Sequence, residues 1–309
     1  MTDRLLRLGT RGSKLALAQS GGIAATVIAE LGRQVEMVSV ATAGDLSTAA
    51  ITQIGGTGVF VAALREALLA GEVDFAVHSY KDLPTAPAPG LVIAAVPLRQ
   101  DARDVLVARD GLTLGELPAG ARIGTGSPRR TAQLLGLGLG HEVVPIRGNV
   151  DTRIGKVRSG EVDAVVLARA GLARLDRLDD ATEVIDPLTM LPAPAQGALA
   201  LECRADDLEV LALLRLLEDP DSRLAVDAER AMLAALEAGC TAPVGALATV
   251  AEGDDGFEIY LRGLVAAVDG TDAVRLSATG PTSEAAEVGR RLAAELLDLG
   301  AADLMGVTR

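Results

Sequence analysis

The chain has 309 residues, enough for two or three domains, and its hydrophobic and charged fractions of 49% and 23% are those of a folded globular protein. A formal net charge of −13 opposes binding to nucleic acids and anionic membranes, and 2% aromatic residues are too few for base stacking. No stretch is apolar enough for a membrane span or a secretory signal, so we expect a cytoplasmic protein. Two cysteines and two histidines make a disulfide framework or a metal site unexpected.

Short apolar runs alternate with helical patterns in the first part of the chain. The patterns predict strands at residues 5–10, 35–42 and 73–79, and helices at residues 14–31 and 59–70. Strands that alternate with helices in this way form a parallel or mixed sheet covered by helices. We therefore predict an α/β fold.

Three landmarks of this first part recur later in the same order. Residues 7–13 resemble residues 122–127, because each stretch runs from an apolar strand into a Gly-Thr turn. Residues 36–40 resemble residues 142–146, and residues 71–74 resemble residues 160–163. The separations, 115, 106 and 89 positions, shrink along the chain. We expect two lobes of one topology, the first with extra residues in the Gly-rich loop 44–58.

The last third of the chain has a different pattern. The proline-rich stretch 192–197 predicts an extended crossing that returns the chain to the first lobe. After it we predict a helix at 223–238, strands near 247–251, 258–268 and 274–278, and a closing helix at 284–299. These elements predict a small third domain with an antiparallel sheet.

Two loops place hydroxyl and backbone N–H groups where a helix begins. Ser13 lies in the first loop, and Thr125 and Ser127 lie in the second. Such helix starts attract anions, although plain helix capping explains the same residues. Five arginines near these loops and near the turn 147–151 favour a site for carboxylates or phosphates, provided that the lobes face each other across a cleft; otherwise they are scattered surface residues. They are Arg11, Arg129, Arg130, Arg147 and Arg153.

Residues 78–84 (HSYKDLP) follow an apolar strand. Side chains at such a strand end point into the crevice where α/β proteins bind ligands. Lys81 could neutralise a ligand carboxylate, and Asp82 could stabilise a developing cation or move a proton. A surface salt bridge before a proline turn is the alternative for this pair. His78 is more simply explained as a packed, hydrogen-bonded histidine.

Each of the two cysteines is, by itself, most simply an inert thiol. Cys203 has apolar neighbours, whereas Cys240 lies in a turn-rich loop where a thiolate could react. The glycines at 55–58 have no Lys-Ser or Lys-Thr after them, so they do not form a phosphate-binding P-loop. A mobile lid is the better interpretation of that segment.

Taken together, the motifs resemble those of the porphobilinogen deaminase family over essentially the whole chain. The motifs that carry the resemblance are residues 78–84 (HSYKDLP), 124–130 (GTGSPRR), 147–150 (RGNV), 191–197 (LPAPAQG) and 237–240 (EAGC). The resemblance implies two lobes like those of type II periplasmic binding proteins and a small α+β C-terminal domain with a three-stranded antiparallel sheet. In this chain the first lobe would be residues 1–98 with 196–217, the second lobe 99–195, and the C-terminal domain 218–309.

The resemblance also implies a reaction and a cofactor. Four porphobilinogen molecules are deaminated and joined head to tail on a dipyrromethane primer, which is bound through a thioether to the cysteine that matches Cys240, and hydrolysis then releases the linear tetrapyrrole hydroxymethylbilane. Asp82 is the expected catalytic residue, because a carboxylate stabilises the cation left by loss of ammonia. Phe60 is expected to pack at the active site. The residues expected to bind cofactor and substrate are Arg11, Ser13, Ser79, Lys81, Thr125, Ser127, Arg129, Arg130, Arg147, Arg153 and Gln196.

Some positions depart from the family pattern. Ala195 stands where the crossing segment usually has glycine, and the loop 44–58 has Gln53 and Thr57 where lysines are common. The loop is therefore less basic, which bears on its hold on the growing chain but not on the core chemistry.

Two other functions fit part of the pattern. A non-catalytic bilobed module that binds anions or solutes would explain the repeat and the arginines, but not the third domain with Cys240. A phosphate-transferring enzyme would need a metal-binding carboxylate cluster or a P-loop, and the sequence shows neither. We expect a monomer, because no heptad seam or extra apolar stripe is visible.

Overall fold

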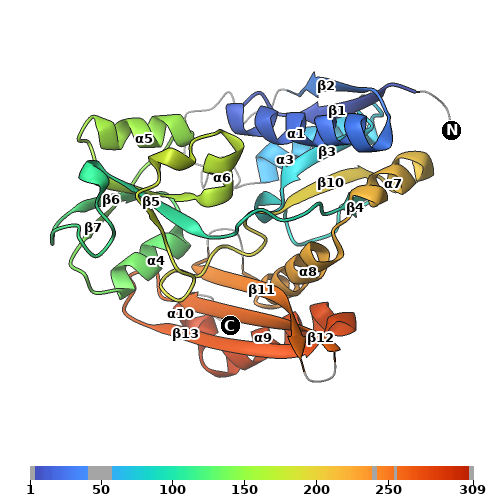
Figure 1. Cartoon of the computed structure of the whole chain (residues 1–309). Coiled ribbons are helices and arrows are strands. Elements are labelled where there is room, and N and C mark those ends of the chain that lie inside the picture. The colour runs from blue at the N-terminus through green and yellow to red at the C-terminus, as the bar shows by residue number, and fades with distance from the viewer. Residues whose placement is uncertain (1–3, 41–57, 239–241, 254–255, 306–309) are drawn as a thin grey trace. The chain divides into compact units, whose positions relative to one another are not determined.

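The computed structural model describes residues 4–40, 58–238, 242–253 and 256–305 (Figure 1). They form two compact units. The first contains Met1–Arg99 and Ala198–Arg223, and the second contains Gln100–Gly197 and Leu224–Arg309. No helix in these described ranges is long and apolar enough to cross a membrane.

The first unit contains a five-stranded sheet, which with its helices we call lobe 1. The strand order is β2-β1-β3-β10-β4, in which β1 (Leu6–Thr10), β2 (Val35–Ser39) and β3 (Phe75–Ser79) are parallel. The strand β10 (Leu199–Arg204) runs antiparallel between β3 and β4 (Leu91–Ala95). The crossing segment 192–197 therefore returns the chain to lobe 1, as predicted, but it is not extended throughout, because residues 194–197 form a turn in which Ala195 has φ 60°.

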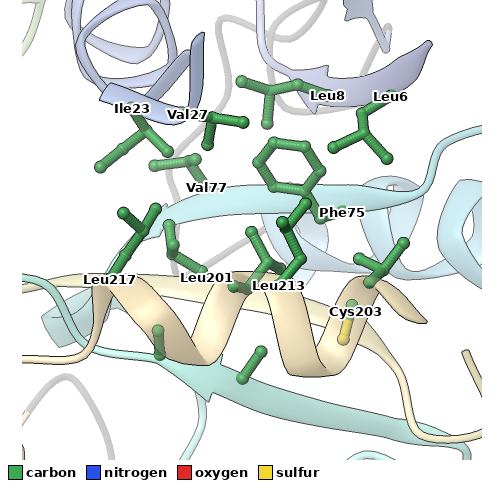
Figure 2. Packing of buried hydrophobic residues seen from close by; sticks show 14 of the residues in the cluster. Leu6, Leu8, Ile23, Val27, Phe75, Val77, Leu201, Cys203, Leu213 and Leu217 are labelled. Carbon is green, nitrogen blue, oxygen red and sulfur yellow. The ribbon is translucent and has the colours of Figure 1, made fainter. Parts of the chain in front are cut away.

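Helices cover both faces of the lobe 1 sheet. Helix α1 (Lys14–Leu31) and helix α7 (Leu208–Leu214) bury apolar side chains on one face, and α3 (Gly58–Leu69) packs on the other. Figure 2 shows the first of these clusters, in which the ring of Phe75 lies among aliphatic side chains from several elements. Helix α1 begins at Lys14 because Ser13 caps it, and it ends at Gly32, which has φ 63°.

The second unit contains lobe 2, whose sheet has the order β7-β6-β8-β5-β9. Its strands are β5 (Asp104–Ala108), β6 (Arg122–Thr125), β7 (Glu142–Pro145), β8 (Ala164–Ala168) and β9 (Glu183–Val184). Helix α4 (Pro128–Gly136) packs on one face, and α5 (Val150–Arg158) and α6 (Arg169–Arg174) pack on the other.

The two lobes have one topology, which confirms the prediction from the repeat. In lobe 1, Gly9 pairs with Val38 and Ala76. In lobe 2, Gly124 pairs with Val144 and Val165. These equivalent positions are 115, 106 and 89 residues apart, the same separations that the sequence landmarks show. Nine of the extra residues of lobe 1 lie between β1 and β2, and 17 lie between β2 and β3, so the prediction that they lie in the loop 44–58 accounts for only part of them. Residues 41–57 lie outside the described residues.

The second unit also contains the predicted three-stranded antiparallel sheet. Its strands are β11 (Val244–Gly253), β12 (Gly256–Ala266) and β13 (Ala273–Pro281). Helix α9 (Ala285–Asp298) and the second part of α8 (Pro220–Ala235) pack on one face of this sheet. The opposite face contacts lobe 2 through Ala132 of α4, which packs with Leu264 and Ala266. The structure thus confirms the expected fold class. It has two α/β lobes of one topology and a C-terminal α+β region with a three-stranded antiparallel sheet.

The start of α8 was predicted three residues too late. The Asp219 side chain accepts a hydrogen bond from the Ser222 N–H at 2.8 Å, and Pro220 follows it as the first helical residue. This cap and proline add a first turn that the apolar periodicity does not show. At the other end the helix stops at Ala235, before Glu237, which has φ 50°.

Candidate functional site

Polar side chains gather at the carboxyl ends of the parallel strands of lobe 1. Arg11 and Ser13 follow β1, and Ser79, Lys81 and Asp82 lie at the end of the neighbouring strand β3 and in the turn η1 (Tyr80–Asp82). Carboxyl ends of adjacent parallel strands meet at one edge of a sheet. The structure therefore brings these predicted residues to one edge, where Asp82 is exposed.

The hydroxyl groups at this edge take part in local hydrogen bonds. The Ser13 hydroxyl accepts a hydrogen bond from the Ala16 N–H at 3.3 Å, which is helix capping. The amide of Gln19 donates to the Ser79 hydroxyl at 2.9 Å. These contacts orient both side chains, and their role toward a ligand stays a prediction.

His78 is a buried, packed histidine, as the simpler interpretation held. Its Nε2 lies 3.2 Å from Oε2 of Glu202 on β10, and Arg65 of α3 contacts the same carboxylate at 2.9 Å. Burial by itself would raise the pKa of Glu202, but the hydrogen bonds from His78 and Arg65 outweigh it and hold that pKa below its ordinary value. We call these three residues the Glu202 cluster; it ties α3 to the two strands.

The equivalent edge of lobe 2 contains most of the other predicted residues. Thr125 ends β6, and Ser127 caps α4 by accepting a hydrogen bond from the Arg130 N–H at 3.5 Å. Arg147 follows β7 and is exposed, and Arg153 lies in α5. The Nε of Arg153 donates to the Gly148 carbonyl at 2.8 Å, which fixes the guanidinium against the turn before α5.

Arg129 and Arg130 do not line an open surface, contrary to the expectation that both face a polar cleft. Their exposed fractions are 4% and 6%, and both pair with Asp104 on β5, a residue with no exposure at all. Nη2 of Arg129 lies 2.9 Å from Oδ2 of Asp104, and Nη2 of Arg130 lies 2.8 Å from Oδ1. The Gln196 amide also donates to Oδ1, at 2.7 Å. We call these four residues the Asp104 cluster.

Backbone carbonyls complete the hold on the two arginines. Nη1 of Arg129 donates to the Leu191 carbonyl at 2.7 Å, and Nη1 of Arg130 donates to the Val166 carbonyl at 2.9 Å. Burial alone would raise the pKa of Asp104, but the charges of the two arginines hold it far below its ordinary value. The cluster is therefore ionised, with one negative charge facing two positive charges.

Sequence reasoning missed Arg174, the last residue of α6, which is the helix that follows β8. Its Nη2 donates to the Gly197 carbonyl at 2.6 Å, and burial lowers the pKa of its guanidinium to about 10. Burial, together with the charge of Arg130, also lowers the pKa of Arg153. Among the described residues, neither Arg153 nor Arg174 has an acidic side chain within salt-bridge distance.

Asp104 was also missed, and the sequence contains a signal for it. An aspartate opens the otherwise apolar run of β5, and a carboxylate in a buried strand requires a cationic partner. The identity of that partner depends on the fold, because Arg129 and Arg130 lie on another element.

Lobe 2 therefore has two buried guanidinium groups against the one buried carboxylate of Asp104, and half-buried Arg153 and Arg174 have no acidic partner among the described residues. The Nε atoms of Arg129 and Arg130 are also buried without a hydrogen-bond partner among the described residues. Guanidinium groups with too few carboxylate partners are suited to binding an anion that has several carboxylates, because each guanidinium can form charge-assisted hydrogen bonds with such an anion. A cofactor that is rich in carboxylates suits this set of donors.

The two cysteines differ in what the structure shows. Cys203 is fully buried in the apolar cluster of Figure 2, and burial raises the pKa of its thiol to about 11. It is therefore a poor nucleophile, as predicted. Cys240 and the side chain of Phe60 lie outside the described residues.

The fold and the buried cations define a class, a bilobed α/β protein with an excess of buried positive charge in its second lobe. The model of the porphobilinogen deaminase dipyromethane cofactor-binding domain matches residues 6–212, and the model of the porphobilinogen deaminase C-terminal domain matches residues 223–298. The chain belongs to the porphobilinogen deaminase family.

Curated relatives agree with this membership. "Porphobilinogen deaminase 1" of Streptomyces coelicolor is 60% identical over 99% of each chain. "Porphobilinogen deaminase" of Mycobacterium tuberculosis is 58% identical over 97% of this chain and 98% of its own length. Among solved structures, a periplasmic substrate-binding protein of an ABC transporter from Coxiella burnetii is 14% identical, with a TM-score of 0.44, over 73% of this chain and 96% of its own.

Proposed function

We propose that this chain deaminates four porphobilinogen molecules and joins them head to tail on a covalently bound dipyrromethane, and that water then releases the linear tetrapyrrole hydroxymethylbilane. It would thus be a transferase of tetrapyrrole synthesis. Its membership of the family and the names of its relatives support this activity.

The buried and half-buried arginines of lobe 2 are the observation that carries the proposal. Every pyrrole unit of cofactor, substrate and product has an acetate and a propionate group, so the bound chain is a polycarboxylate. Arg153 and Arg174 lack an acidic partner among the described residues, and Arg129 and Arg130 share the single carboxylate of Asp104. Carboxylates of the ligand would supply the missing negative charge.

We assign roles to the residues at each lobe edge. Ligand carboxylates would be bound in lobe 1 by Lys81, Arg11 and the two serines. In lobe 2 they would be bound by the predicted arginines and hydroxyl groups, to which we add Arg174. Asp82, exposed at the end of β3, would accept hydrogen bonds from pyrrole N–H groups and stabilise positive charge as ammonia leaves. That the two edges line one cleft, with Phe60 packed in it, stays a prediction.

Cys240 would hold the cofactor through a thioether. The bound dipyrromethane supplies the pyrrole carbon to which the first substrate unit is added. A thioether resists hydrolysis, so one attachment can serve many cycles of synthesis. The support for Cys240 is its sequence motif together with the buried, weakly acidic state of Cys203.

Three further expectations are part of the proposal. The division into lobe 1 (1–98 with 196–217), lobe 2 (99–195) and a C-terminal domain (218–309) rests on the family motifs. A monomeric state rests on the absence of a heptad seam in the sequence. A cytoplasmic location is expected from the biosynthetic activity that we propose.

Intact-protein mass spectrometry tests the covalent cofactor. We expect the purified chain to carry a mass excess of two linked pyrrole units, which peptide mapping places on Cys240. Cys240→Ser should abolish this adduct. Cys203→Ala, the matched control, should keep it, because the Cys203 thiol lies in the core and alanine fits there.

Each outcome of this experiment has a clear meaning. An adduct that persists in Cys240→Ser contradicts the assignment of the attachment site. A bare wild-type chain that gains no mass after addition of porphobilinogen contradicts the catalytic function and favours the non-catalytic binding module.

A further inference from the structure

We propose that Asp104 is a positioning residue, which holds Arg129 and Arg130 in the orientation that binds ligand carboxylates. The inference rests on the proposed function, since it assumes that these arginines bind the carboxylates of cofactor and substrate. It adds a residue that never touches the ligand but determines how two ligand-binding residues are placed.

The first argument is the geometry of the carboxylate. Arg129 and Arg130 are consecutive residues of one helix, so their side chains leave the helix in directions about 100° apart. Each oxygen of Asp104 nevertheless receives one of them, at 2.9 Å and 2.8 Å. A single carboxylate thus brings together two side chains that the helix would separate.

The second argument is that the other end of each guanidinium is also fixed. Nη1 of Arg129 is held by the Leu191 carbonyl, and Nη1 of Arg130 is held by the Val166 carbonyl. With both Nη atoms fixed, the plane of each guanidinium is fixed as well. Arginine loses little binding energy to side-chain entropy when its fork is preorganised in this way.

The third argument is that the cluster is itself anchored. Oδ1 of Asp104 accepts a hydrogen bond from the Gln196 amide at 2.7 Å, and the same amide donates to the Ala102 carbonyl at 2.7 Å. The preceding residue, Ala195, donates its N–H to the buried carboxylate of Glu229 on α8. The orientation of the arginine pair is thus tied to the crossing segment and to the helix that leads toward Cys240.

Charge gives Asp104 a second effect on the pair. Two guanidinium groups that are buried together repel each other, and among the described residues Asp104 supplies the only carboxylate within salt-bridge distance of either one. Without its charge, at least one guanidinium would leave the cluster for a position with more solvent. The pair would then lose the arrangement that the shared carboxylate imposes on it.

The test is a comparison of apo and cofactor-loaded protein in the variants Asp104→Asn and Asp163→Asn. Asp163 is the matched control, because it is an aspartate of the same unit that pairs with Arg109 at 2.7 Å and binds the Arg122 N–H, but lies outside the cluster. The readouts are adduct mass, the melting temperature of each form, and kcat and KM for porphobilinogen.

If Asp104 positions the pair, the gain in melting temperature on cofactor loading falls by more than half in Asp104→Asn, and KM rises roughly tenfold with a smaller change in kcat. In Asp163→Asn both forms lose stability equally, so the gain on loading and the KM stay as in the wild type. Equal destabilisation of apo and loaded Asp104→Asn, with wild-type KM, would overturn the inference.

Asp104→Glu keeps the test decisive if Asp104→Asn does not fold. Glutamate retains the charge but displaces the carboxylate by one methylene group. Positioning predicts a reduced gain on loading and a raised KM, whereas charge balance alone predicts wild-type values for both, which would refute positioning.

Arg129→Lys and Arg130→Lys separate this inference from the proposed function. If these variants also leave the gain on loading and KM unchanged, the arginines do not bind the ligand and their proposed role fails. If they change both quantities while the Asp104 variants change neither, only the role of Asp104 fails.

Discussion

Ala195 has a backbone conformation that its side chain disfavours. Its φ is 60°, in the left-handed region where glycine is preferred, and the family usually has glycine at this position. The residue is fully buried, and its N–H is bound by Glu229, so the surroundings hold it in place. The departure from the family pattern that the sequence shows is therefore a site of local strain.

Ala195→Gly should accordingly stabilise the protein. Relief of the left-handed strain is worth about 1–2 kcal/mol, and the greater freedom of glycine in the unfolded chain removes about 0.4–1 kcal/mol of it. We expect a net rise of roughly 0.5–1 kcal/mol in the free energy of unfolding, measured by urea denaturation. Ala198→Gly, at a buried position without positive φ, should lower it; a loss of stability in both variants would contradict the explanation.

Asp82 is expected to affect the rate without affecting the fold. Because the side chain is exposed in the turn after β3, Asp82→Asn should leave the melting temperature within about 2 °C of the wild type. Loss of the negative charge from the reacting centre should reduce kcat by a factor of about 100–1,000. Steady-state kinetics and thermal unfolding measure the two effects, and a kcat within threefold of the wild type would exclude a catalytic role.

At the scale of the elements, the Glu202 cluster connects a helix and two strands through one buried carboxylate. Since the pKa of Glu202 is lowered in the folded state, its ionised form stabilises the fold at every pH above its ordinary value near 4.5. That stabilisation is lost as the pH falls from there through the lowered pKa. The cluster thus makes the attachment of α3 sensitive to acid.

Glu202→Gln should therefore have a pH-dependent effect. At pH 7 we expect a loss of about 3 kcal/mol in the free energy of unfolding, because Arg65 and His78 lose their partner in a buried site. The difference from the wild type should shrink below pH 4. Glu287→Gln, which removes an exposed pair with Arg290, should cost under about 0.5 kcal/mol at pH 7. A Glu202→Gln effect that is constant from pH 7 to pH 3 would refute the linkage.

The sequence predicted most elements because their signals are local. Short apolar runs, helical patterns, Ser13 and Ser127 as caps, and the three repeated landmarks are all read from neighbouring residues, and the registers of the two sheets agree with them. The arrangement of the candidate arginines of lobe 2 could be predicted only in part. The arginines at strand ends were visible, but the pairing of Arg129 and Arg130 with Asp104 joins residues from different elements, and only the folded chain brings them together.

At the scale of the whole chain, charge is distributed unevenly. Residues 218–309 contain 17 acidic and 7 basic residues, a net charge of −10, whereas residues 99–195 contain 13 of each. The whole net negative charge that opposes polyanions therefore lies outside the stretch that forms lobe 2. Net charge alone would have argued against an anionic ligand, although lobe 2 places its arginines in the interior and at the strand ends.

The position of β10 has a consequence for how the protein is made. Lobe 1 begins the chain, but β10, which lies between β3 and β4 in its sheet, is supplied by residues 199–204. Lobe 2 needs only residues 104–184 to complete its sheet. During synthesis on the ribosome, the second lobe can therefore finish its sheet before the first.

Until residue 204 has left the ribosome, β3 and β4 have no strand between them, and their unpaired edges are open to proteases and to other chains. Ribosome-bound chains stopped at residue 197, allowing for the length hidden in the exit tunnel, should resist proteolysis across lobe 2 and be cut within residues 1–99. Chains extended beyond residue 223 should resist proteolysis in both lobes. If lobe 1 already resists proteolysis in the chains stopped at residue 197, it folds without β10, which would contradict this prediction. The two lobes are thus expected to fold in the opposite order to that in which they begin along the chain.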